Sequence, residues 1–231
     1  MIKIHKSTER GESNLGWLQS HFSFSFADYH NLERMSFGTL RVLNDDIIAP
    51  GKGFGTHDHN NMEIITIVTE GILEHKDSTG TKETITNTEI QVMSAGSGIE
   101  HSEYNHSKTE QVKLFQIWIE PKEYDIKPRH DKKSYTIKDN TLTVVVSGTN
   151  EPNTLYIHQN AKILLGKYTK TEKIDYKIQK NKGLFVFVID GSLNVDNHTL
   201  NARDSAEITA QNASITTKPG LFLMLIEVSM A

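Results

Sequence analysis

Apolar and polar positions along the chain form short runs that are typical of β-strands. These runs are rich in β-branched residues and end at glycine, proline or turn-forming polar residues. We expect strands at residues 63–70, 71–75, 89–93 and 112–119, with a hairpin turn at 77–80. No long amphipathic helix is predicted, and the best candidate for a short helical turn is residues 31–34. The pattern therefore predicts an all-β fold of the barrel or sandwich kind.

An internal repeat divides the chain into two halves. Residues 67–71 (IVTEG) are echoed by residues 187–191 (FVIDG), and each glycine is followed by a strand, a polar turn and a glutamate-isoleucine pair. Two copies of one strand pattern predict two antiparallel β-barrels packed together. We expect the first barrel at residues 1–120 and the second at 136–231. Prolines and a charged run interrupt the pattern between them, which predicts a linker at 121–135.

Composition limits the classes of function. The 231 residues carry a formal net charge of −4, whereas a nucleic-acid-binding protein would normally carry a basic patch. The absence of cysteine excludes disulfides and cysteine-ligated zinc and is compatible with a reducing compartment. No apolar run approaches the ~20 residues of a membrane-spanning helix, and the first residues lack the apolar segment of a secretory signal. We therefore expect a cytoplasmic protein that contacts neither nucleic acid nor membrane.

Two short polar motifs indicate a metal site. His57-Asp58-His59 and His101-Ser102-Glu103 each place two ligand-type side chains two residues apart, and such side chains share one face of a strand. If the two strands meet, three imidazoles and one carboxylate converge. That set suits a first-row divalent transition metal better than calcium or magnesium. Glu63 would share the face of His57 and His59 if its strand runs unbroken, so it is a further candidate ligand.

The repeat predicts no equivalent site in the second half. The positions that correspond to the four candidate ligands His57, His59, His101 and Glu103 are Lys177, Gln179, Pro219 and Leu221. The second barrel is therefore expected to be degenerate and without metal. The remaining histidines are expected at the surface or in the core, and these are His5, His21, His30, His75, His106, His130, His158 and His198.

Several other residues are less specific. The phenylalanines at 22, 24 and 26 alternate with serines, which predicts a half-buried strand. Trp118 is expected in the core, whereas Phe54 and Met62 fit the mouth of the site as well as they fit the core. Asn105 is expected in a turn, and residues 167–173 are expected on a solvated face.

The motif residues resemble those of the cupin superfamily. Gly51, His57-x-His59, Glu63 and Gly71 have the spacing of its first motif, and Gly98-x-x-His101-x-x-x-Asn105 has that of its second. More narrowly, residues 57–63, 70–71 and 93–103 are similar to the pirin family, whose bacterial members include quercetin 2,3-dioxygenases. Gly96 stands where many cupins have proline, a difference that we expect to change the turn and not the metal site. The resemblance covers nearly the whole chain and is vague in the second half.

The resemblance implies a bicupin, with two jelly-roll-like barrels and one metal in the first. In pirins the ligands fall on the positions that are here His57, His59, His101 and Glu103. In many other cupins the carboxylate of the first motif is the ligand. Glu63 is therefore either a ligand or a neighbour that orients a bound imidazole, and we favour the second role. Fe(II) is the expected ion, with Zn, Ni, Cu, Mn or Co as alternatives.

The resemblance also implies a reaction. A three-histidine, one-carboxylate shell leaves a coordination position open for a substrate oxygen or dioxygen. The family suggests a dioxygenase that opens the central ring of a flavonol with release of carbon monoxide, and Glu103 is the natural base for the substrate hydroxyl. A second possibility is a non-enzymatic, redox-responsive metal protein that binds a partner protein. A third is a purely structural metal in an interaction protein.

Overall fold

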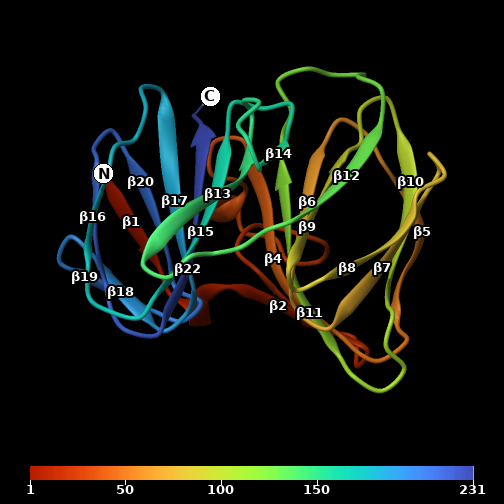
Figure 1. Ribbon diagram of the computed structural model, residues 1–231, viewed down its shortest axis with the longest axis horizontal. Coiled ribbons are helices and arrows are strands. Elements are labelled where there is room, and N and C mark those ends of the chain that lie inside the picture. The colour runs from red at the N-terminus through yellow and green to blue at the C-terminus, as the bar shows by residue number, and fades with distance from the viewer. Residues whose placement is uncertain (231) are drawn as a thin grey trace.

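The computed structural model describes residues 1–230, and nearly all of their regular structure is β-strand. Two barrels lie side by side (Figure 1), and each combines one seven-stranded and one four-stranded sheet. The predicted all-β fold of two packed barrels is therefore confirmed. No helix within residues 1–230 has the length and apolar character needed to cross a membrane.

The first barrel consists of the sheets that carry the candidate metal ligands. In spatial order, its larger sheet comprises β12 (Arg129–Ser134), β9 (Glu89–Ser94), β6 (Glu63–Glu70), β11 (Val112–Ile119), β4 (Leu40–Ile48), β3 (Leu18–Phe22) and β2 (Gly11–Asn14). Its smaller sheet comprises β5 (Gly53–His59), β10 (Ile99–Asn105), β7 (Ile72–Asp77) and β8 (Lys82–Thr86). The predicted strands at 63–70, 71–75, 89–93 and 112–119 correspond to β6, β7, β9 and β11.

The second barrel repeats this arrangement. In spatial order, its larger sheet comprises β1 (Ile2–His5), β20 (Ser205–Thr209), β17 (Lys182–Asp190), β22 (Leu221–Ser229), β15 (Lys162–Tyr168), β13 (Thr141–Ser147) and β14 (Leu155–Tyr156). Its smaller sheet comprises β16 (Lys173–Tyr176), β21 (Ala213–Thr217), β18 (Ser192–Val195) and β19 (His198–Asn201). Two 3₁₀ turns complete the structure, η1 (Ser7–Glu9) and η2 (Leu32–Arg34), and η2 lies where a helical turn was predicted.

Two strands cross the barrel boundaries that the sequence predicted. Strand β1, at the N-terminus, pairs with β20 and so belongs to the second barrel, where Figure 1 draws it in red among blue strands. Strand β12 pairs with β9 of the first barrel, although residues 121–135 were expected to be a linker. In both cases a short, partly exposed strand completes a sheet edge, and its own sequence does not reveal its partner.

The two larger sheets pack against one another through apolar side chains. One buried cluster unites residues of both barrels, among them Leu43, Ile65, Phe115, Phe185 and Phe187. The rings of Phe115 and Phe187 lie 5.5 Å apart across this interface. Strand β6 is therefore covered on both faces, and its first six residues, from Glu63 to Val68, are all buried.

The phenylalanine-serine alternation at residues 22–26 does not form the predicted half-buried strand. Strand β3 ends at Phe22, and Ser23, Phe24 and Ser25 are all buried. The buried Arg34 guanidinium donates to the Ser23 carbonyl oxygen at 2.7 Å and lies 5.0 Å from the Phe24 ring. The segment therefore turns, so that Phe24 packs on Phe185 at the barrel interface, 5.6 Å away, while Phe26 faces the interior of the first barrel.

Candidate metal centre

Three histidines converge at one wall of the first barrel. His57 and His59 extend from β5, and His101 extends from β10, where it is the direct cross-strand partner of His57. Their ring centroids lie 4.4 Å (His57–His101), 4.8 Å (His57–His59) and 4.9 Å (His59–His101) apart. One nitrogen of each ring lies within 4.8 Å of the others, a spacing that suits a shared metal ion.

The protonation of these rings suits metal binding. The Nδ1–H of His57 donates to the Gly55 carbonyl oxygen at 2.8 Å, which leaves Nε2 with a free lone pair. The Nε2 of His101 is buried and has no hydrogen-bond partner. Burial and the neighbouring imidazoles lower the pKa of His59 to about 4 and that of His101 to about 2. Both rings are therefore neutral at neutral pH, and neutral imidazole is the form that ligates metals.

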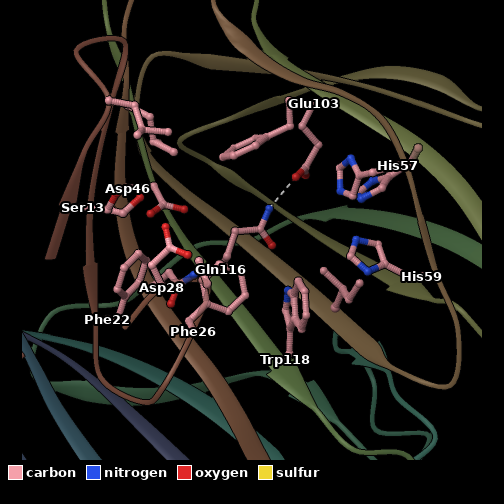
Figure 2. A pocket seen from close by; sticks show the side chains of 18 residues that line it. Ser13, Phe22, Phe26, Asp28, Asp46, His57, His59, Glu103, Gln116 and Trp118 are labelled. Carbon is pink, nitrogen blue, oxygen red and sulfur yellow. Dashed lines mark hydrogen bonds between the residues drawn. The ribbon is translucent and has the colours of Figure 1, made fainter. Parts of the chain in front are cut away.

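Glu103 lies on the same strand as His101 but turns toward the barrel interior. A register shift separates the two residues, because Glu103 pairs with Phe54 while His101 pairs with His57. Glu103 Oε2 accepts a hydrogen bond from Gln116 Nε2 at 2.7 Å (Figure 2), and Oε1 is buried without a partner. Burial, together with the negative charge of Asp46, raises the Glu103 pKa to about 7.

The predicted ligand set is thus divided between two overlapping groups. His57, His59 and His101 form the first, while Glu103 groups with His101 and His75 in the second. Both groups in the part of the chain that the structure describes belong to the first barrel. Glu103 Oε1 and His101 Nε2 are both buried without a hydrogen-bond partner, and an unpaired buried polar atom costs about 1–3 kcal/mol. A cation would satisfy both, so the donor set fits a transition metal.

Glu63 does not share the face of His57 and His59, because the unbroken strand on which that placement depended is not present. Strand β5 ends at His59 and β6 begins at Glu63, with Asn61 between them at a φ of +46°. This break removes the period-two relation on which the prediction relied. Glu63 instead accepts a hydrogen bond from Ser94 at 2.8 Å and lies 3.4 Å from His158 of the second barrel.

A cavity of about 330 Å³ lies beside the histidines. Its walls include the aromatic residues Phe22, Phe26, Phe54 and Trp118, and Figure 2 shows Trp118 near His59. The Trp118 ring lies 4.9 Å from that of His59, so this residue lines the site and is not a core residue as predicted. Phe54 also lines the cavity, whereas Met62 packs beside Ile64 and Met93.

The cavity has a polar end that the sequence did not predict. Asn44 and Asp46 on β4 are buried, and one side-chain oxygen of each has no hydrogen-bond partner. Figure 2 draws Asp46 on the side of the cavity away from His57 and His59. Burial raises the Asp46 pKa to about 7, against a hydrogen bond from Ser20 that lowers it. Such unsatisfied acceptors in a cavity are suited to receive donors from a ligand.

Comparisons with known proteins agree with this fold. The chain matches the Pirin family over residues 3–119 and the family described as quercetinase C-terminal cupin domain over residues 144–228. The fold and the histidine cluster define a two-barrel cupin with a candidate metal centre in its first barrel. The chain belongs to the pirin family.

Individual relatives extend over nearly the whole chain. A protein of Escherichia coli K12 named quercetin 2,3-dioxygenase is 40% identical over 92% of this chain and 92% of its own. A pirin-like protein of Caulobacter vibrioides is 36% identical, over 98% of this chain and 99% of its own. The crystal structure of bacterial pirin YhhW from Escherichia coli in complex with nickel(II) superposes with a TM-score of 0.96 at 37% identity and covers 100% of both chains.

Proposed function

We propose that this protein is a metal-dependent dioxygenase that opens the central ring of a flavonol of the quercetin class and releases carbon monoxide. The observation that carries the proposal is a cluster of three histidines in the wall of an aromatic-lined cavity. The name of the Escherichia coli relative and the nickel ion bound to YhhW support it. A metal that served only the fold would need no adjoining cavity, so the cavity favours an enzyme over a structural site.

We assign the metal to His57, His59, His101 and Glu103, with Fe(II) as the expected ion and Zn, Ni, Cu, Mn or Co as alternatives. When bound, the ion would supply an open coordination position for oxygen ligands and lower the pKa of a substrate hydroxyl. Glu103 Oε1 is buried at the cavity wall and free of hydrogen bonds, so one of its lone pairs can face the ion while the other accepts the proton of that hydroxyl. Gln116 holds the other carboxylate oxygen and so fixes the direction of Oε1.

The size and the lining of the cavity suit a flat polyphenol. Its volume of about 330 Å³ lies near the lower end of small-molecule sites, which span about 300–1,000 Å³. Phe26 and Trp118 meet edge to face with their centroids 5.4 Å apart, and they form an apolar wall against which aromatic rings can pack. Asn44 and Asp46 then offer acceptors to the phenolic hydroxyls at the far end of the substrate.

Oxygen uptake tests the proposed reaction directly. Purified protein loaded with Fe(II) should consume dioxygen when quercetin is added, and carbon monoxide should accumulate in step with uptake. An oxygen electrode follows the first quantity and a haem-based optical assay the second. The same protein stripped of metal is the control. Uptake no faster than that of the stripped protein would count against the enzyme and favour a non-enzymatic regulator that binds a partner protein.

The polar end of the cavity gives a prediction about substrate selection. Asp46→Asn replaces a buried carboxyl acceptor by an amide, and a hydrogen bond to the ionised carboxylate contributes about 1.5–3 kcal/mol. We expect the KM for quercetin to rise roughly tenfold, since part of that contribution is kept by the amide oxygen. Galangin, a flavonol without hydroxyls on its pendant ring, should show little change in KM.

The matched control for this prediction is Asp28→Asn. Asp28 lines the same cavity but is exposed, so the same exchange of side chains is made and no buried acceptor is lost. Steady-state kinetics on the two flavonols measure both variants. If Asp46→Asn changed the KM for quercetin and for galangin equally, Asp46 would not bind the pendant-ring hydroxyls.

A further inference from the structure

His75 is buried directly beside the candidate ligand His101, although its place in the sequence indicated no special role. It lies on β7, which pairs with β10 so that His75 is opposite Glu103 and Asp77 is opposite His101. The side chains of His75 and Asp77 are both fully buried. His75 Nδ1 lies 3.5 Å from His101 Nδ1, and His75 Nε2 lies 2.9 Å from Asp77 Oδ2. A continuous line of polar contacts therefore runs from His101 to Asp77.

The chemistry of the groups fixes the direction of the hydrogen bonds in this line. Asp77 Oδ1 accepts from the backbone N–H and the hydroxyl of Thr79 and from the backbone N–H of Thr81. A carboxylate held by these donors is an acceptor, so His75 donates its Nε2–H to Oδ2. The Nδ1 of neutral His75 is then unprotonated, and it faces His101 as a hydrogen-bond acceptor. Only one hydrogen fits between the two Nδ1 atoms, and it must belong to His101.

We propose that His75, oriented by Asp77, is a positioning residue that holds His101 in the tautomer whose Nε2 is free for metal. The inference rests on the proposed metal centre, and it agrees with the unpartnered, buried Nε2 of His101. Carboxylates and carbonyls that orient metal-bound imidazoles commonly change metal affinity by about 10–100-fold. Here the carboxylate acts through an intervening imidazole.

The stacking of His130 on His75 supports this role. The two rings lie 4.5 Å apart with an angle of 23° between their planes. His130 belongs to β12, the strand from the predicted linker that completes the first barrel. The stacked ring restricts rotation of His75, and so the Nδ1 that faces His101 cannot turn away without disturbing a packed sheet.

Asp77→Asn should exchange donor and acceptor in each hydrogen bond between position 77, His75 and His101. The introduced amide can keep its Oδ1 contacts to Thr79 and Thr81, but its nitrogen would donate to His75 Nε2. His75 would then carry its proton on Nδ1 and force His101 to protonate Nε2, the nitrogen that should face the metal. Exchange of an orienting carboxylate for its amide is known to trap the wrong histidine tautomer. We expect the Kd for Zn(II), measured by competition with a chromophoric chelator, to rise about 10–100-fold.

A double-variant cycle separates this effect from a structural one. His75→Phe removes the acceptor without installing an opposing donor, and it should raise the Kd less than Asp77→Asn does. In the His75→Phe background, adding Asp77→Asn should change the Kd by less than about threefold, because the path to His101 is gone. Glu100→Gln is the control for charge, since this exposed carboxylate lies next to His101 in the chain and makes no contact with His75. Equal losses from Asp77→Asn in both backgrounds would overturn the proposal.

Nitrogen NMR of the unaltered protein gives a test that needs no variant. In ¹⁵N-histidine-labelled protein loaded with Zn(II), His101 should carry its proton on Nδ1 and His75 on Nε2. A metal-bound Nδ1 on His101, or a metal-bound His75, would overturn the proposal, because His75 would then be a ligand with His101 and Glu103. Failure of the wild-type protein to bind Zn(II) would overturn the metal centre and this role together. Binding by the wild type that Asp77→Asn leaves unchanged would overturn the positioning role alone.

Discussion

Replacement of His101 by alanine is expected to reduce bound metal to less than about a tenth of the wild-type amount, since removing an orienting contact alone costs about 10–100-fold. His101 belongs to both candidate groups of ligands. Its ring lies 4.4 Å from that of His57 and 4.9 Å from that of His59. It is also the most deeply buried of the three, at 2% exposure. Without it, two half-exposed imidazoles remain on β5. Elemental analysis after dialysis against a weak chelator measures the loss.

His106→Ala is the matched control for the loss of an imidazole. His106 follows the same strand, but its side chain is 52% exposed and pairs with Glu74 at the surface. The variant should bind the wild-type amount of metal. Undiminished metal in His101→Ala would remove this residue from the site, and a loss of equal size in both variants would indicate a general defect in folding.

Glu103→Gln is expected to lower turnover much more than it lowers metal content. The substitution keeps the size of the side chain and an oxygen that can accept from Gln116, but it removes the base. A well-placed general base contributes about 10²–10⁴-fold to a rate, and we expect kcat to fall within this range. Metal content should fall at most about threefold, since the three histidines remain and an amide oxygen can still approach the ion.

Parallel measurement of metal content and kcat on the same preparation decides between two roles of Glu103. Glu74→Gln, a partly exposed glutamate on the neighbouring strand β7, is the control and should leave both quantities unchanged. If Glu103→Gln lost metal and turnover in the same proportion, Glu103 would act only as a ligand. If Glu103→Gln kept the wild-type kcat and the full metal content, Glu103 would be neither a ligand nor the base.

Local spacing determined much of the site. The period-two arrangement of His57 with His59, and of His101 with Glu103, is a property of single strands and can be derived before their partners are known. The repeat in the chain likewise predicted two barrels, because each half carries its own strand and turn pattern. These features depend on residues close together in sequence.

Glu63 and Trp118 show the limits of the same reasoning. A strand period applies only while the strand continues, and the turn at Asn61 ended it before Glu63 could join the pair. Trp118 lies in an apolar run that is typical of a core strand. Only the position of β11 in the first barrel shows that its side chain lines a cavity. Both outcomes depend on where strands end and which face of a sheet is covered.

The sequence by itself determined an all-β chain of two related halves, and it predicted His57, His59, His101 and Glu103 as candidate metal ligands in the first. Only the tertiary structure decided that β1 joins a sheet of the second barrel and β12 a sheet of the first. It also decided that Asn44 and Asp46 line the same cavity as the histidines. The contact of Asp77 with His75, and of His75 with His101, is likewise a property of the tertiary structure. The physical reason is that periodicity acts along a strand, whereas these contacts form between strands whose pairing is set by the burial of the whole sheet.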